Sequence, residues 1–264
     1  MTAPGASAFE AAFEEKLTEI NELLDEIQQL INAVAVELNN TMRRLPSPVC
    51  WAISRSWDFF LPQANKYFDR MQEFIGAPGY PPALFRLGDY WDLHVGTPVS
   101  GEQQVVSAFG MKADDKWTGS AASAYKDSAE AQARAVGTIK PLAERIQNVL
   151  NDLAWGIIAF WAALIVAAGT FVVGMAGALG LAASVFGAPA APIDAGATVA
   201  TVVGLLGAAV LAYVAYAEKI QGSMSTMQQA LNDNGGLVVQ GGQGSWPRVD
   251  GSTYDGTGRW RVNY

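Results

Sequence analysis

The most constraining feature of the sequence is a pair of long apolar stretches in its second half. No charged residue lies between Leu153 and Ile193, and after Asp194 a second uncharged run extends to Ala217. A helix needs about 20 consecutive apolar residues to cross a bilayer. Each run is long enough for one such helix, so a chain with these two stretches must either place them in a membrane or bury them.

Two apolar helices joined by a short connection predict a membrane-inserting hairpin over residues 153–217. We expect spans near 154–183 and 197–217, with a Gly-Ala-Pro-rich turn near 187–196. Small residues let helices approach closely in lipid, and Trp and Tyr favour the membrane–water interface. The residues expected at the helix interface or in an aromatic belt are Trp155, Trp161, Gly169, Gly174, Gly177, Gly180, Gly204, Gly207, Tyr213 and Tyr216.

Other placements of this hairpin stay open. It could be a buried hairpin of a soluble protein, or it could be sheltered in a soluble bundle and released on contact with a bilayer. The last plan is similar to that of pore-forming helical toxins, in which long helices flank an apolar hairpin. If insertion is co-translational, the flanking cations Lys140, Arg145 and Lys219 predict that both ends face the cytoplasm.

The N-terminal segment predicts a long amphipathic helix. It opens with a Ser7–Glu10 capping box. Apolar residues then recur every three or four positions, at Phe9, Phe13, Leu17, Ile20, Leu24, Ile27, Ile31, Val34 and Leu38. The opposite face is acidic, with Glu14, Glu15, Glu19, Glu22, Asp25 and Glu26. The stripe must be covered by another helix, which could belong to the same chain, a second copy or a small helical partner.

Pro46 and Pro48 end this helix, and we interpret Arg43-Arg44 as a feature of its C-terminus. A second amphipathic helix is expected over 51–75, with Pro62 starting or interrupting it. This helix is aromatic-rich, and its rings could form bundle core or an interfacial belt: Trp51, Trp57, Phe59, Phe60, Tyr67, Phe68 and Phe74. Residues 76–101 are rich in Gly and Pro, which predicts a long loop or linker.

Helical pattern returns over about 102–115 and again over about 120–152, where Pro141 should kink or restart the helix. The break between them, at Trp117-Thr118-Gly119, resembles the turn of the WXG100 (ESAT-6-like) family of type VII secretion substrates. The matching positions are Trp117, Gly119, Ala121 and Tyr125, within about residues 102–152. The resemblance implies two antiparallel helices, with Trp packed at the hairpin end, and a function in protein–protein interaction.

Members of that family usually carry a Tyr with an acidic residue four positions later. Here Ala129 follows Tyr125 at that spacing, and Ala217 follows Tyr213. Export would then depend on a partner that supplies the signal, or the protein would stay in the cell membrane. Met1–Glu10 lacks the basic start of a secretory signal peptide, so any export is expected to use a non-classical route.

Composition argues against several other functions. A net charge of −8 and a pI near 4.7 oppose nucleic-acid binding and attraction to anionic lipid. One His, one Cys and the absence of the common nucleotide, hydrolase and zinc motifs leave no constellation for catalysis. We therefore expect a protein that is not an enzyme, with no cofactor, no metal and no small-molecule substrate.

The fold class that the sequence predicts is all-α, an elongated helical bundle with an apolar hairpin and an irregular Gly-rich C-terminal tail. Its expected parts are amphipathic helices and linker (1–101), a WXG-like helix-turn-helix (102–152), the membrane hairpin (153–217), and a helix end with a Gly/aromatic tail of β-hairpins or disorder (218–264). The expected function is that of a WXG100-like, type VII secretion-associated protein that binds a bilayer and a helical partner or itself. The alternatives are a pore-forming protein that is soluble before insertion, and a resident membrane protein with a coincidental W-x-G.

Overall fold

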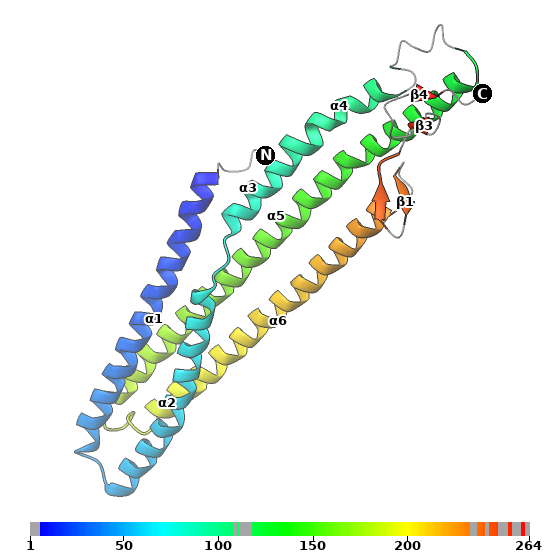
Figure 1. Ribbon diagram of the computed structural model, residues 1–264. Helices are drawn as coiled ribbons and strands as arrows, with labels where there is room; N and C mark the ends of the chain where they lie inside the picture. The colour runs from blue at the N-terminus through cyan, green and yellow to red at the C-terminus, as the bar shows by residue number, and fades with distance from the viewer. Residues whose placement is uncertain are drawn as a thin grey trace. The chain divides into compact units, whose positions relative to one another are not determined.

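The computed structural model describes residues 6–107, 110, 118–232, 237–240, 243–247, 253–254 and 260–261. Helices dominate these residues, which confirms the all-α class (Figure 1). The helices are α1 (Ala6–Met42), α2 (Ser47–Gly76), α3 (Pro81–Trp91), α4 (Thr97–Val106), α5 (Ser120–Ala182) and α6 (Ala191–Asn232), with a π-helical turn η1 (Asp92–Gly96). The strands are β1 (Val238–Gln240), β2 (Gln243–Ser245), β3 (Thr253–Tyr254) and β4 (Trp260–Arg261).

The chain forms two compact units, and α5 and α6 each contribute to both. The first, here called the hairpin unit, contains residues up to Pro82 together with Ala154–Ala217. The second, here called the tail unit, contains Ala83–Leu153 and the residues from Glu218 onward. The hairpin unit is therefore built from α1, α2 and the apolar segments of α5 and α6.

Helix α1 lies along the apolar segment of α5. Near the start of both, Phe9 and Trp155 make an edge-to-face ring contact at 5.9 Å. Near the end of both, the Thr41 hydroxyl donates a buried hydrogen bond of 2.9 Å to the carbonyl oxygen of Ala182. The two helices therefore run in the same direction over the whole length of this segment (Figure 1).

Helices α2 and α6 run the opposite way beside α5. Along α2, Tyr67 packs edge-to-face on Phe171 at 5.0 Å, and Phe74 on Phe160 at 5.1 Å. Along α6, the Phe160 and Tyr213 rings lie 5.4 Å apart. The hairpin unit is thus a bundle of two antiparallel helical hairpins, α1–α2 and α5–α6.

The apolar stripe of α1 is buried within this bundle. Phe13, Ile20, Ile27, Ile31, Val34 and Leu38 are buried, and Phe9, Leu17 and Leu24 are half-buried. Burial of a helical stripe against neighbouring helices is the ordinary source of helix stability in water. The sequence allowed the stripe to be covered by a helix of the same chain, of a second copy or of a partner. In the structure, helices of the same chain cover it, so burial of the stripe needs no partner helix.

The expected loop over residues 76–101 is wrong for most of its length, because α3, η1 and α4 occupy Pro81–Val106. The prolines lie where a helix tolerates them: Pro81 and Pro82 begin α3, and Pro98 lies in the first turn of α4. The first helical turn has no intrahelical partner for its N–H groups, so proline loses nothing there. Only residues 77–80 form a short connection, in which Gly79 has a φ of +70°.

The internal prolines do not end their helices. Helix α2 continues through Pro62, and α5 continues through Pro141 from Ser120 to Ala182. The predicted boundary at residue 152 is therefore no break in the helix. Of the helix expected over 102–115, residues 102–106 belong to α4, while 108–109 and 111–117 lie outside the described residues.

In the tail unit, α3 to α4 lie along the N-terminal part of α5. Gln147 donates a hydrogen bond of 3.1 Å to Asp89, and the Lys219 and Asp152 side chains of α6 and α5 form an ion pair at 3.7 Å. Strand β1 pairs antiparallel with β2, and β3 with β4. In the described part of the tail, the structure thus has short β-hairpins, one of the two forms that the sequence left open.

Candidate membrane-insertion site

Helices α5 and α6 are each long and apolar enough to cross a membrane, over Ala122–Ala182 and Ala191–Thr226. The connection between them is residues 183–190 rather than the expected 187–196, because α6 already begins at Ala191. Pro192 lies in the first turn of α6, where it favours a helix start rather than a loop. The apolar helices are therefore joined by a shorter turn than predicted.

The apolar part of α6 is mostly exposed on the hairpin unit, and that of α5 is exposed along part of its surface. In the most apolar 18-residue segment of each helix, 33% of the residues of α5 and 22% of those of α6 are buried within the chain. A core helix of a soluble protein of this length would be mostly buried. The exposed large apolar side chains of this region include Val166, Val173, Ile193, Val203, Leu205, Val210, Leu211 and Val214.

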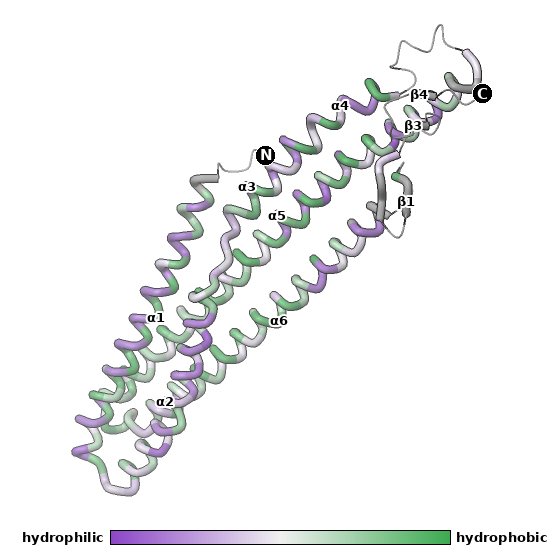
Figure 2. Tube along the Cα trace, viewed as in Figure 1, coloured by the Kyte–Doolittle hydropathy of each residue, from purple (hydrophilic) through white to green (hydrophobic). Residues whose placement is uncertain are grey.

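Helices α1 and α2 cover the other face of the hairpin. Buried side chains on that face include Leu164, Phe171 and Met175 of α5 and Val199 and Val202 of α6. The acidic face of α1 points to solvent, since all six carboxylates of the predicted acidic face are exposed. Figure 2 shows this contrast, with the hairpin segments of α5 and α6 largely hydrophobic and α1 and α2 alternating in hydropathy. The hairpin unit therefore has one charged side and one apolar side.

Only part of the predicted glycine interface is found. A methyl group at Gly174 would overlap the Thr198 side chain, so α5 and α6 approach closely there, and a methyl group at Gly177 would lie 3.5 Å from Asp194 Oδ2. At Gly169, Gly180, Gly204 and Gly207, no described atom lies within 4 Å of that position, apart from the adjacent residues and the nearby backbone of the same helix. Helix period explains the difference, because these glycines are spread around each helix and cannot all face the partner.

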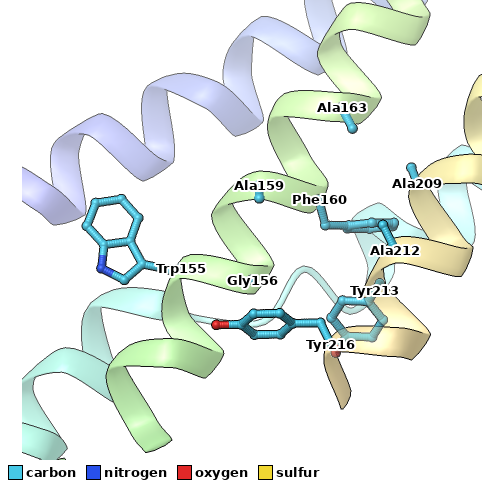
Figure 3. A pocket seen from close by; sticks show the side chains of 9 residues that line it. All are labelled: Trp155, Gly156, Ala159, Phe160, Ala163, Ala209, Ala212, Tyr213 and Tyr216. Atoms are coloured by element: carbon cyan, nitrogen blue, oxygen red, sulfur yellow. The ribbon is translucent and has the colours of Figure 1, made fainter. Parts of the chain in front are cut away.

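Sequence reasoning missed a second close contact, at Gly156, where a methyl group would overlap the ring of Tyr216. The available signal was a glycine directly after Trp155 in an otherwise bulky segment. The Tyr216 ring lies beside the α5 backbone at this point, next to Tyr213 and Phe160 (Figure 3). These residues line an apolar cavity of about 340 Å³ between α5 and α6, together with Trp155, Ala159, Ala163, Ala209 and Ala212.

The four aromatic residues predicted to form a belt differ in their exposure. Trp155 and Tyr213 are exposed, and Tyr216 is half-buried in the cavity. Trp161 is buried instead, and its indole N–H donates a hydrogen bond of 2.9 Å to the carbonyl oxygen of Pro78. A buried indole needs such a partner. Trp161 therefore anchors the connection between α2 and α3 and is not part of an exposed belt.

Asp194 is the only charged residue between Leu153 and Ala217. It lies in the first turn of α6, where a carboxylate is stabilised by the free N–H groups and the helix dipole. The preceding turn exposes Val185 and Phe186, and the Phe186 side chain is 98% exposed. A fully exposed phenylalanine in the turn of an apolar hairpin is a residue that the sequence pattern did not single out.

The W-x-G motif is only partly described. Gly119 has a φ of +108°, a conformation that L side chains rarely adopt, and α5 begins at the next residue. Tyr125 is half-buried on α5. Trp117 and the side chain of Ala121 lie outside the described residues.

The described residues bring no three His, Cys, Asp or Glu side chains together as metal ligands. Comparison with protein-family models, curated proteins and solved structures finds no match to this chain. The arguments about its function therefore rest on the geometry of the hairpin unit.

Proposed function

We propose that this chain is a helical membrane-inserting protein whose α5–α6 hairpin, over residues 154–217, enters a bilayer. The observation that carries the proposal is the exposed apolar face of two helices that are long enough to span a bilayer. In the most apolar 18-residue segment of each helix, only 33% of the residues of α5 and 22% of those of α6 are buried. Contiguous exposed apolar surface of this kind marks a membrane or protein interaction site. This is the pore-forming or permeabilising alternative of a protein that is soluble before insertion.

The covering helices define what insertion must involve. The outer face of α1 carries exposed carboxylates such as Glu15, Glu22 and Glu26. A charged side chain at the centre of a bilayer costs about 2.5–3.5 kcal/mol or more. The hairpin therefore cannot cross the membrane with α1 held along it, so α1 and α2 cover one face of the hairpin before insertion and part from it when the hairpin enters lipid.

Photolabelling from within the bilayer tests this proposal. The full chain is mixed with vesicles that contain a lipid-borne carbene precursor, and labelled peptides are mapped by mass spectrometry. We expect label in residues 154–217 and none in the α1 stripe between Phe13 and Leu38. Label confined to α2, or no label at all, would contradict the proposal. A chain found exclusively in carbonate-resistant membranes from synthesis onward would support the resident-membrane alternative.

A second candidate function is that of a type VII secretion-associated protein of the WXG100-like kind, which acts through protein–protein contact. The positive φ of Gly119 directly before α5 favours it, because a Trp-x-Gly turn requires such a residue. Co-expression in hosts with and without a type VII secretion ATPase tests it. Export only in the first host supports this function, and equal retention in both, or an unchanged result for Trp117→Ala, contradicts it.

A further inference from the structure

The two turns of the hairpin unit lie at the same end of the unit. The Thr41–Ala182 hydrogen bond joins the end of α1 to the end of α5. The chain turns back just beyond each of these two helix ends. Figure 1 shows the α1–α2 turn and the α5–α6 turn at this common end. We call this end the basic tip and define it by Arg43, Arg44, Trp51, Arg55 and Phe186.

The tip is positively charged in a chain that is acidic overall. Between Leu38 and Trp57 the only charged residues are Arg43, Arg44 and Arg55. Arg43 and Arg44 are exposed, and within the described residues neither forms an ion pair. The α5–α6 turn carries no charge, and the first turn of α6 adds one, Asp194. The tip residues thus carry three positive charges against the single negative charge of Asp194, with Glu37 and Asp58 just beyond them, in a chain whose net charge is −8.

The tip also presents apolar and aromatic surface to solvent. Phe186 is fully exposed, and Trp51 is exposed with the Arg55 guanidinium over its ring, 5.4 Å from the centroid. A guanidinium over the face of a tryptophan ring is a cation–π contact, and the long arginine side chain keeps its charged group in water. Tryptophan itself favours the headgroup zone.

We propose that the basic tip is the surface with which the protein first contacts a membrane, and that it recognises anionic phospholipid. The arginines would bind the headgroup phosphates, and Phe186 would enter the acyl region ahead of the hairpin. Charge complementarity selects this occupant, because the tip combines a cluster of cations with exposed apolar side chains. This inference rests on the proposed function, since it names the lipid that the inserting hairpin meets.

Vesicle flotation tests the inference on the full chain. Vesicles of phosphatidylcholine alone are compared with vesicles that also contain phosphatidylglycerol, at low and at high salt. We expect tighter binding to the anionic vesicles, and this preference should weaken in high salt because exposed charges are screened. R43Q/R44Q should lower affinity for anionic vesicles by about thirtyfold, from about fivefold per arginine, and should leave affinity for neutral vesicles unchanged.

K66Q/R70Q is the control for net charge. It changes the net charge by the same amount on the exposed face of α2, away from the tip, and also removes the exposed Arg70–Glu73 ion pair. We expect it to bind anionic vesicles as the unchanged chain does. For the apolar part, Phe186→Ser should slow vesicle leakage, whereas Phe59→Ser removes an exposed aromatic of α2 and should not. Helical content by circular dichroism shows that each variant is folded.

The outcomes separate the inference from the proposed function. If the chain enters neutral and anionic vesicles equally, and R43Q/R44Q matches the unchanged chain, the tip inference is overturned while membrane insertion stands. If both double variants lose binding alike, net charge rather than the tip is responsible, and the inference is also overturned. If the unchanged chain enters neither kind of vesicle, both proposals fail.

Discussion

At the scale of single residues, the hairpin depends on a few close contacts between α5 and α6. Gly174 and Gly156 are the positions at which a side chain would meet the opposite helix, at Thr198 and Tyr216. The sequence pattern offered six glycines as candidates and could not decide among them, because the rotation of each helix about its axis is set by packing against α1 and α2. The turn residue Phe186 was missed for a related reason, since apolar periodicity says nothing about exposure in a turn.

Replacing Gly174 tests this packing. Gly174→Ala should destabilise the folded chain by about 1–3 kcal/mol, because the new methyl group overlaps Thr198 and the helices must move apart. The matched control is Gly180→Ala, where no described atom lies within 4 Å, and there the better helix propensity of alanine should stabilise by up to about 1 kcal/mol. Urea unfolding followed by circular dichroism measures both. Equal midpoints for the two variants would contradict the contact.

Tyr67 supplies a pH-dependent prediction. Its ring packs on Phe171 and its hydroxyl is buried without a hydrogen-bond partner among the described residues. Burial raises the pKa of Tyr67 above its usual value of about 10. The neutral form is therefore favoured in the folded state, so the stability that Tyr67 contributes is present below about pH 10 and is lost as pH rises above that value.

Tyr67→Phe removes both the unsatisfied hydroxyl and this titration. We expect the variant to be as stable as the unchanged chain at pH 7, or more stable by up to about 1 kcal/mol, because an unpaired buried hydroxyl contributes nothing favourable. Between about pH 10 and 11 it should lose less stability than the unchanged chain. Thermal unfolding at pH 7 and at about pH 11 measures this. A large loss of stability of Tyr67→Phe at pH 7 would reveal a hydrogen-bond partner for the hydroxyl.

At the scale of elements, α1 acts as the cover of the hairpin. Its stripe and its length could be predicted from the sequence, because apolar spacing of three and four residues is a direct signal of one helix face. The helix that buries the stripe could not be predicted, since an amphipathic stripe fits an intrachain and an intermolecular partner equally well. The helices within residues 76–101 could not be predicted, because Pro is both a loop signal and a residue of the first helical turn, and here it lies at helix starts.

Weakening the cover should release the hairpin. Ile27 is fully buried in the α1 stripe, and Ile27→Ala should destabilise the folded chain by about 2–5 kcal/mol. Because the insertion proposed above requires α1 to part from α5, the same variant should release dye from vesicles faster than the unchanged chain. Its neighbour Glu26 is exposed, and Glu26→Ala should change stability by less than about 0.5 kcal/mol and leave dye release unchanged. Slower dye release by Ile27→Ala would argue against a sheltering role.

At the scale of the whole chain, the central feature is the exposed apolar surface of the hairpin unit. The all-α class and the two span-length helices were predictable, since absence of charge over such a length has few physical solutions. The sheltered state is one of several placements that the sequence leaves open, and our proposal of it is supported by the burial of one face of the hairpin and the exposure of the other. Each unit holds a segment of both α5 and α6, so the helix boundaries did not follow the predicted domain boundary.

Charges on the exposed face should abolish insertion without loss of fold. Val173 and Leu211 are 74% and 71% exposed, so Val173→Lys/Leu211→Lys should fold normally and stay in solution without detergent. In the bilayer each lysine would cost about 2.5–3.5 kcal/mol, so the variant should fail to enter vesicles. Phe59→Lys, at an exposed position of α2, is the control and should insert normally. Ultracentrifugation and flotation measure the two properties, and undiminished insertion of the double variant would exclude this face.

The most direct test of the central claim is a depth measurement at two single cysteines. Because Cys50 is the only cysteine, a Cys50→Ser background allows a polarity-sensitive dye at Val173→Cys, on the exposed face of α5, or at Glu22→Cys, on the outer face of α1. On addition of anionic vesicles, we predict a blue shift at position 173 and quenching there by acyl-chain quenchers, with no change at position 22. An unchanged, water-exposed dye at position 173 would contradict insertion of the hairpin.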